Sequence, residues 1–154
     1  MRALKPRDTP DLAAVTLTFP AGPEADRIER ALLDLQGPDG GWGPFPNVRS
    51  EPFDTAIAVL ALRSRPATSA RSAAIARGLD YLRSSIGDDG SWVETTRPAG
   101  QRSYAQRLST TGWAVMALLS KDVSALSIIS RSGDRGIADR GIGNLGIEGP
   151  SGRR

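Results

Sequence analysis

The sequence contains no cysteine and no histidine. These absences exclude disulfide bonds, thiolate nucleophiles, zinc sites built from Cys and His, and catalytic triads with a His base. Enzyme chemistry within this chain would have to come from carboxylates, hydroxyls, Lys, Arg and aromatic side chains. We expect neither a bound metal nor a cofactor.

Long hydrophobic runs are also missing. The two longest, Ala56–Leu62 and Trp113–Leu119, contain seven residues each. A helix that crosses a bilayer needs about 20 apolar residues, so we expect no membrane span. The weakly apolar stretch Leu12–Phe19 follows Asp11 and makes a poor signal peptide, which favours a cytoplasmic protein.

Neither sign of charge dominates the chain. Twenty Lys and Arg residues stand against 17 Asp and Glu residues, which gives the 154 residues a net charge of +3. The basic residues are scattered among acidic ones, without the basic face and interleaved aromatic residues of a nucleic-acid binder. We therefore predict no nucleic-acid partner.

The first helix is expected just after residue 22. Residues 1–22 carry prolines at positions 6, 10 and 20 without a sustained period, which predicts a loose lead-in. Gly22-Pro23 then opens a helix, since proline suits a first turn, and Gly37-Pro38 ends it. The apolar residues of this helix recur at helical spacing, and charged residues such as Glu29 take the other face. The apolar set is Ile28, Ala31, Leu32 and Leu35.

The two apolar runs predict helices that are buried on all sides. The run Ala56–Leu62 follows Asp54, a good N-cap or first-turn acid, and its three alanines favour helix over a buried strand. The run Trp113–Leu119 follows a cap at Ser109-Thr110-Thr111. Between them, residues 69–85 predict an amphipathic helix with Arg71 off its apolar stripe.

The two halves of the chain repeat at an offset of fifty residues. The matched pairs are Leu32 and Leu82, Gln36 and Ile86, Asp39 and Asp89, Gly40 and Gly90, and Trp42 and Trp92. Each half reads as an amphipathic helix, a glycine-rich loop and an apolar helix, which predicts two helical hairpins with the apolar helices inside. Each inner helix would keep an apolar face uncovered, as at an interface.

The pattern fails after Lys121. Val123, Leu126 and Ile129 predict a short helix, and residues 131–154 hold seven glycines and five arginines. That composition buries too little apolar surface to offset chain entropy, so we expect a disordered tail.

The turns between helices are the most informative residues. Asp-Gly, at Asp39-Gly40 and Asp89-Gly90, permits a tight turn with positive φ. The tryptophan two residues later can then fold back on the helix just ended. Gln36 can offer its amide to the indole or to backbone groups at the start of the next helix.

On these residues the sequence resembles the terpenoid cyclase and protein prenyltransferase superfamily, and most of all the squalene-hopene cyclases. Their repeated QW motif is matched by Arg30-Ala31-Leu32-Leu33 with Gln36 and Gly40-Gly41-Trp42, and by the second turn with Ile86 in place of Gln. The segment Ser109–Leu119 is similar to a segment near the C-terminus of those cyclases. The resemblance covers about residues 25–120 and implies a partial α/α-toroid over residues 23–120.

The resemblance also implies where chemistry would lie. The acidic cyclase motif corresponds to Glu51-Pro52-Phe53-Asp54-Thr55-Ala56, with Phe53 at the position of the proton-donating Asp. A phenyl ring cannot be a general acid. Asp54 and Glu51 stay as candidate acids, Trp113 as a candidate cavity-lining residue, and Gln36, Gly40, Trp42, Gly90 and Trp92 as structural residues.

Three functions fit these residues. The first is a truncated or degenerate cyclase-like repeat that is not catalytic alone, binds a polyprenyl or triterpene ligand and touches a membrane surface from its side. The second is a helical assembly module, joined to copies of itself or to a complementary toroid subunit through its exposed inner helices. The third is one part of an oligomeric cyclase that uses Asp54 or Glu51 as its acid.

Overall fold

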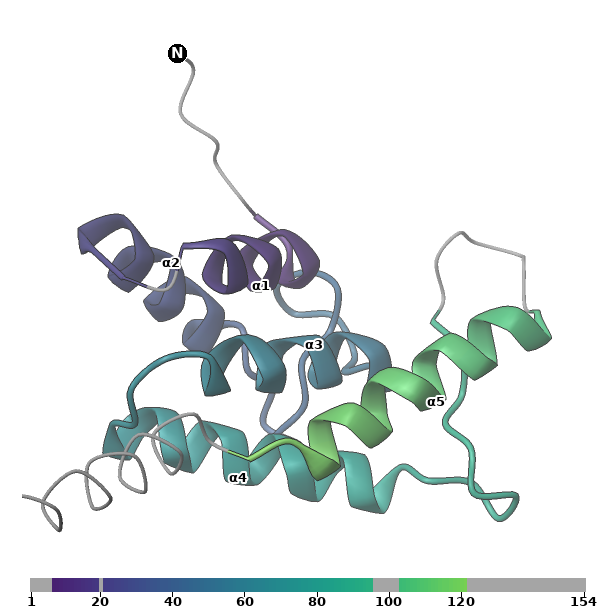
Figure 1. Ribbon diagram of the computed structural model, residues 1–154. Coiled ribbons are helices and arrows are strands. Elements are labelled where there is room, and N and C mark those ends of the chain that lie inside the picture. Colours follow the sequence, from purple (N-terminus) through teal and green to yellow (C-terminus); the bar gives the residue numbers. More distant parts are fainter. Residues whose placement is uncertain (1–6, 20, 96–102, 122–154) are drawn as a thin grey trace, which may run out of the picture.

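The computed structural model describes residues 7–19, 21–95 and 103–121, and this part of the chain is all-helical (Figure 1). An isolated bridge between Gln36 and Trp42 is its one β-type pairing. The predicted all-α class is thus confirmed. The helices are α1 (Thr9–Thr18), α2 (Pro23–Asp34), α3 (Pro52–Arg63), α4 (Ser69–Ser84) and α5 (Tyr104–Leu119).

Local sequence explains where the helices begin. Asp8, Thr68 and Ser103 precede α1, α4 and α5, and each side chain accepts a backbone N–H from the first turn. The helices α1, α2 and α3 carry a proline in the first turn, where no intrahelical N–H is needed. The predicted start at Gly22-Pro23 is confirmed.

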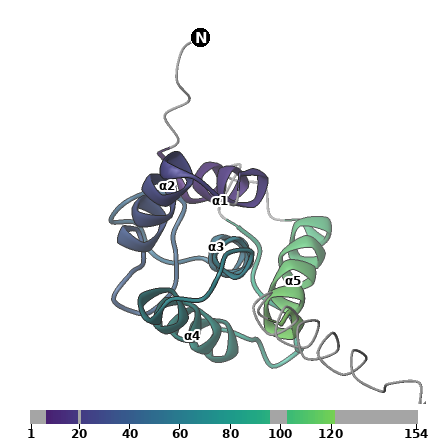
Figure 2. The ribbon, with the colours of Figure 1, turned by 60° about the vertical axis from the view of Figure 1, so that its left-hand side comes forward.

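Helix α3 lies at the centre of the arrangement. Figure 2 views it nearly end on, with the other four helices around it. It packs against α1, α4 and α5, and every residue of Ala56–Leu62 is buried except the half-buried Leu60. Helices α1, α3 and α5 run in one direction, and α2 and α4 run back (Figure 1). The first set of helices, α1, α3 and α5, corresponds to the inner layer of the predicted toroid, and α2 and α4 correspond to its outer layer. That these layers close into a toroid stays a prediction.

The expectation of a loose lead-in over residues 1–22 is wrong for residues 9–18, which form α1. Thr9 anchors this helix, because its backbone N–H donates to the Pro44 carbonyl at 3.1 Å and its hydroxyl donates to the Gly43 carbonyl at 2.6 Å. The buried Thr16 hydroxyl is satisfied by the Leu12 carbonyl at 2.8 Å. These threonines conceal the helical period, since they are polar residues on a buried face. Because α1 covers α3, Ala56–Leu62 keeps no uncovered apolar face, contrary to prediction.

Helix α5 also differs from its prediction. It begins at Tyr104 with Ser103 as its cap, about one and a half turns before the predicted cap at Ser109-Thr110-Thr111. It is not buried on all sides: Ala114 and Ala117 are fully buried, whereas Leu119 is 75% exposed. The predicted uncovered apolar face is confirmed for this helix. The short helix and disordered tail predicted for residues 121–154 lie outside the described residues, apart from Lys121.

A buried ion pair joins the two outer helices. Arg71 of α4 donates to both carboxylate oxygens of Glu29 on α2, at 2.6 and 2.7 Å, and Arg65 approaches the same carboxylate at 2.7 Å. The sequence pattern predicts that Glu29 and Arg71 lie off the apolar faces of their helices, toward solvent. This prediction is wrong, because both side chains are buried. The pairing arises between residues 42 positions apart, so no local pattern reveals it.

No helix within the described segments has the length and hydropathy that a bilayer crossing requires. The predicted cytoplasmic location and membrane-surface contact stay predictions.

The contact between α4 and the core passes through Gly78. A Cβ atom at this position would lie 2.8 Å from both Trp42 Cζ3 and Val59 Cγ2. We expect Gly78→Ala to lower the free energy of unfolding by about 1–3 kcal/mol through overpacking. Gly112→Ala in α5 is the matched control, because a Cβ there meets nothing within 4 Å. It should raise stability by about 0.5–1 kcal/mol. Urea unfolding measures both, and an equal response of the two variants would contradict this packing.

Candidate functional site

The first tryptophan turn, Gln36–Trp42, fastens the end of α2 to the start of α3. Trp42 is fully buried, and its indole Nε1 donates to the Leu32 carbonyl at 2.8 Å. Gly37 N donates to the Gly41 carbonyl at 2.8 Å, and Gly40 holds a φ of 85°. That φ is open to glycine and strained for other residues, so the Asp-Gly spacing predicts the turn correctly.

The second turn, Ile86–Trp92, repeats this set of bonds. Trp92 Nε1 donates to the Leu82 carbonyl at 2.8 Å, and Gly87 N donates to the Ser91 carbonyl at 2.8 Å. Gly90 holds a φ of 76°. The offset of fifty residues therefore extends from residue types to individual hydrogen bonds. In both turns the indole folds back on the helix just ended, as predicted.

Two threonines complete the turns, and sequence reasoning missed them. The backbone N–H of Trp42 donates to Thr55 Oγ1 at 2.9 Å, and that of Trp92 donates to Thr111 Oγ1 at 3.2 Å. These hydroxyls come from α3 and α5 at an offset of 56 residues, longer than that of the turns. Aligning Thr55-Ala56 with Thr111-Gly112 would have found the pair.

Gln36 ties the first turn to α4, not to the indole or to the start of α3. Its Nε2 donates to the Gly40 and Ala74 carbonyls, both at 2.8 Å, and Arg77 donates to its Oε1. The indole needs no amide, because the Leu32 carbonyl already accepts its N–H. Ile86, the counterpart in the second turn, is 47% exposed and offers no polar group.

The candidate acids lie at the start of α3. Glu51 is the N-cap residue and Asp54 stands in the first turn, so the prediction of a first-turn acid is confirmed. Both are buried, Asp54 completely. A helix N-terminus favours nearby negative charge, which gives both carboxyl groups a structural role. Catalysis by either one stays a prediction.

A pocket of about 380 Å³ opens beside these residues, between α1 and α5. Its lining residues are Pro10, Phe53, Thr95, Gln106, Ser109 and Thr110, so it presents hydroxyls, an amide and a phenyl ring but no carboxyl group. Phe53 meets Trp113 edge to face, with ring centroids 6.3 Å apart. Trp113 thus supports the pocket through Phe53 without lining it. Its role in a larger cavity stays a prediction.

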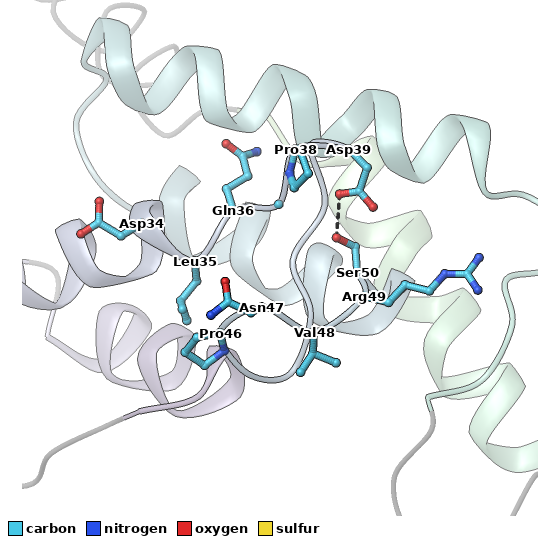
Figure 3. A pocket seen from close by; sticks show the side chains of 11 residues that line it. Asp34, Leu35, Gln36, Pro38, Asp39, Pro46, Asn47, Val48, Arg49 and Ser50 are labelled. Atoms are coloured by element: carbon cyan, nitrogen blue, oxygen red, sulfur yellow. Dashed lines mark hydrogen bonds between the residues drawn. The ribbon is translucent and has the colours of Figure 1, made fainter.

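Figure 3 shows a second, open pocket of about 480 Å³ where the first turn meets the loop before α3. Asp39 points toward Ser50, whose hydroxyl donates to Asp39 Oδ1 at 2.7 Å. The Tyr81 hydroxyl of α4 donates to the Ser50 carbonyl at 2.8 Å. These bonds hold the first turn against the loop before α3 and against α4, which gives Asp39 and Ser50 a structural role. Over the described segments, no three Asp and Glu side chains gather as a metal site would require.

Burial raises the pKa of Tyr81 to about 12, and the nearby Asp39 carboxylate adds to the effect. An ordinary tyrosine ionises near pH 10. The folded chain therefore holds this proton more tightly than the unfolded chain does. The contribution of Tyr81 to stability is complete below pH 10 and is lost as the pH rises toward 12. Ultraviolet titration of the phenols should show an ionisation near pH 12 that Tyr81→Phe removes. Its persistence in the variant would contradict this assignment.

Removing either indole N–H should loosen its turn. Trp42→Phe and Trp92→Phe leave the Leu32 and Leu82 carbonyls without that donor. Each carbonyl keeps a backbone N–H donor, from Leu35 or Ser85, so the loss of the indole bond should lower the free energy of unfolding by about 0.5–1.5 kcal/mol, measured in urea. Trp113→Phe is the control, because a phenyl ring keeps the contact with Phe53 and the described structure gives the Trp113 indole no comparable bond. An equal loss in the control would show that ring size, not the hydrogen bond, matters.

Comparison with known proteins relates the chain to an enzyme. No family model matches the chain. Over 86 residues the chain is 38% identical to a drimenyl diphosphate synthase of Streptantibioticus cattleyicolor, an enzyme of terpene cyclase type. The match covers 56% of this chain and 16% of that protein. The chain is therefore related to a terpene cyclase-type enzyme and spans about a sixth of its length.

Proposed function

We propose that this chain is a cyclase-like helical repeat unit of the squalene-hopene cyclase type, and that it does not catalyse cyclisation by itself. The observation that carries the proposal is the pair of tryptophan turns. Each turn buries an indole and directs its N–H to the helix ten residues earlier, to Leu32 or Leu82. The relation to a drimenyl diphosphate synthase supports the same lineage.

Phe53 supports the lack of independent catalysis. It stands where the resemblance places the proton donor, and a phenyl ring has no proton to give. The neighbouring acids do not replace it in the pocket described above, because neither Glu51 nor Asp54 lines that pocket. Both belong to the buried start of α3.

The ligand class that we propose for a completed site is a polyprenyl diphosphate or a triterpene hydrocarbon. The name of the related enzyme supports the first, and the resemblance to squalene-hopene cyclases supports the second. Aromatic faces such as Phe53 and Trp113 suit apolar chains and carbocations. Because these ligands have long apolar chains, we propose that the protein is cytoplasmic and reaches them at a membrane surface.

Incubation of the purified chain with squalene and with farnesyl diphosphate tests this proposal. We expect no cyclised product by gas chromatography and mass spectrometry, while a drimenyl diphosphate synthase processed in parallel should show that products are detected. Any cyclised product from this chain would overturn the non-catalytic assignment. If Asp54→Asn then abolished turnover and left helicity intact, the acid of an oligomeric cyclase would be identified.

A further inference from the structure

Thr110 carries a buried hydroxyl that meets no hydrogen-bond partner within the described residues. It lies in the middle of α5 and is 1% exposed. A buried hydroxyl in this state costs free energy, because it has left water without gaining a protein donor or acceptor. Such a hydroxyl is a candidate contact for a ligand.

The other buried hydroxyls of the described segments all have partners. Thr16 shows the usual arrangement inside a helix, since its hydroxyl donates to the carbonyl four residues earlier. Thr9, Ser50 and Thr55 bond to the Gly43 carbonyl, to Asp39 and to the Trp42 backbone. The state of Thr110 is therefore an exception in this fold.

Three hydroxyl residues in succession, Ser109-Thr110-Thr111, stand inside α5 and do not cap it. Helix interiors disfavour Ser and Thr, because their side chains compete for backbone hydrogen bonds. Thr111 has a structural role, since it accepts the Trp92 backbone N–H at 3.2 Å. Ser109 and Thr110 have no comparable bond in the part of the chain that the structure describes, so the fold explains this motif only in part.

Both of these residues line the pocket of about 380 Å³ between α1 and α5. Its volume lies within the range of about 300–1,000 Å³ that is typical of small-molecule sites. Phe53 and Pro10 supply an apolar part of the wall. Trp113 meets the Phe53 ring edge to face, with the ring planes at 89°, and so supports it from behind. The pocket thus combines hydroxyl groups with a surface that suits an apolar ring.

The charge of the wall limits what the pocket can hold. None of its lining residues carries a charge. Next to Thr95 and Gln106 in the chain, Glu94 and Arg107 pair with each other at 3.3 Å. An ionic ligand would lose hydration in this pocket without gaining an opposite charge from the wall. The lining therefore favours a neutral ligand.

We propose that this pocket binds a small neutral alcohol with an apolar ring. The ligand hydroxyl pairs with the hydroxyls of Thr110 and Ser109, and its ring lies against Phe53. A hydroxyl group both donates and accepts, so one such group on a ligand can satisfy the hydroxyl of a threonine. The site lies within a single chain, and the proposal does not rest on the cyclase lineage.

Titration of the full chain, labelled with ¹⁵N, with benzyl alcohol tests the proposal by nuclear magnetic resonance. Toluene is the same ring without the hydroxyl, and benzoate and benzylammonium carry a charge in its place. Benzyl alcohol should bind about two- to tenfold more tightly than toluene, as one neutral hydrogen bond allows, and more tightly than either ion. The amide shifts should centre on Phe53, Gln106 and Thr110.

Thr110→Val keeps the shape of the side chain and removes its hydroxyl. It should reduce the affinity for benzyl alcohol to that for toluene. It should also raise the urea midpoint of the unliganded chain, because it removes a buried polar group that has no partner. Ser109→Ala changes an exposed position and should weaken benzyl alcohol binding without loss of folding. Thr18→Val is the control, since Thr18 is exposed on α1, bonds to the Ala14 carbonyl and does not line the pocket.

Three outcomes would overturn the proposal. Equal binding of benzyl alcohol and toluene, or no binding of either, would show that the hydroxyls serve solvent only. Tighter binding of benzoate or benzylammonium would show that the pocket selects charge. A lower urea midpoint for Thr110→Val would show that its hydroxyl is needed by the fold. The cyclisation assay decides the proposed function separately, whichever probe binds.

Discussion

The fold depends on one bond made twice: an indole N–H that returns to a carbonyl ten residues earlier, from Trp42 to Leu32 and from Trp92 to Leu82. A buried indole needs an acceptor, and carbonyls in the last turn of a helix are available to give one. The Leu32 and Leu82 carbonyls accept the indole N–H in addition to the backbone N–H of Leu35 and Ser85. The indole bond also fixes the direction in which the chain leaves the helix, since the ring must lie back along it. The threonine of the following helix then holds the tryptophan backbone, so two helices meet at one residue.

The surroundings of the first indole explain why α4 lies where it does. Trp42 fills the space that a side chain at position 78 would need, and glycine at that position lets α4 approach. The Gln36 side chain also donates a hydrogen bond from the turn to the Ala74 carbonyl of α4. The second turn has Ile86 in place of the glutamine, so this hydrogen bond has no counterpart there. The two halves therefore share the bonds of their turns but not the bond from the turn to the next outer helix.

Sequence reasoning succeeded where the determinants are local. The start of α2 at Gly22-Pro23, the tight turns and the burial of Ala56–Leu62 follow from residue types at short spacing. It failed where partners are distant in the chain. Helix α1 is held by the loop at Gly43 and Pro44, and Glu29 is buried because Arg71 reaches it from another helix. The positions of Glu51 and Asp54 could be predicted, but their burial could not, because it results from the packing of α3 against helices that are distant in the chain.

Burial on all sides is reached by α3 because α1, α4 and α5 all pack against it. Neither α1 nor α5 is enclosed in this way by the described residues. In a layered repeat each unit is stabilised mainly by the units beside it, so a terminal unit needs either a polar outer face or another unit. The outer face of α5 is apolar, with Leu119 mostly in solvent. The counterpart of Val115 on α3 is Val59, which is fully buried beside Gly78 of α4, so the exposed apolar face of α5 has the composition of a face that packs against another helix.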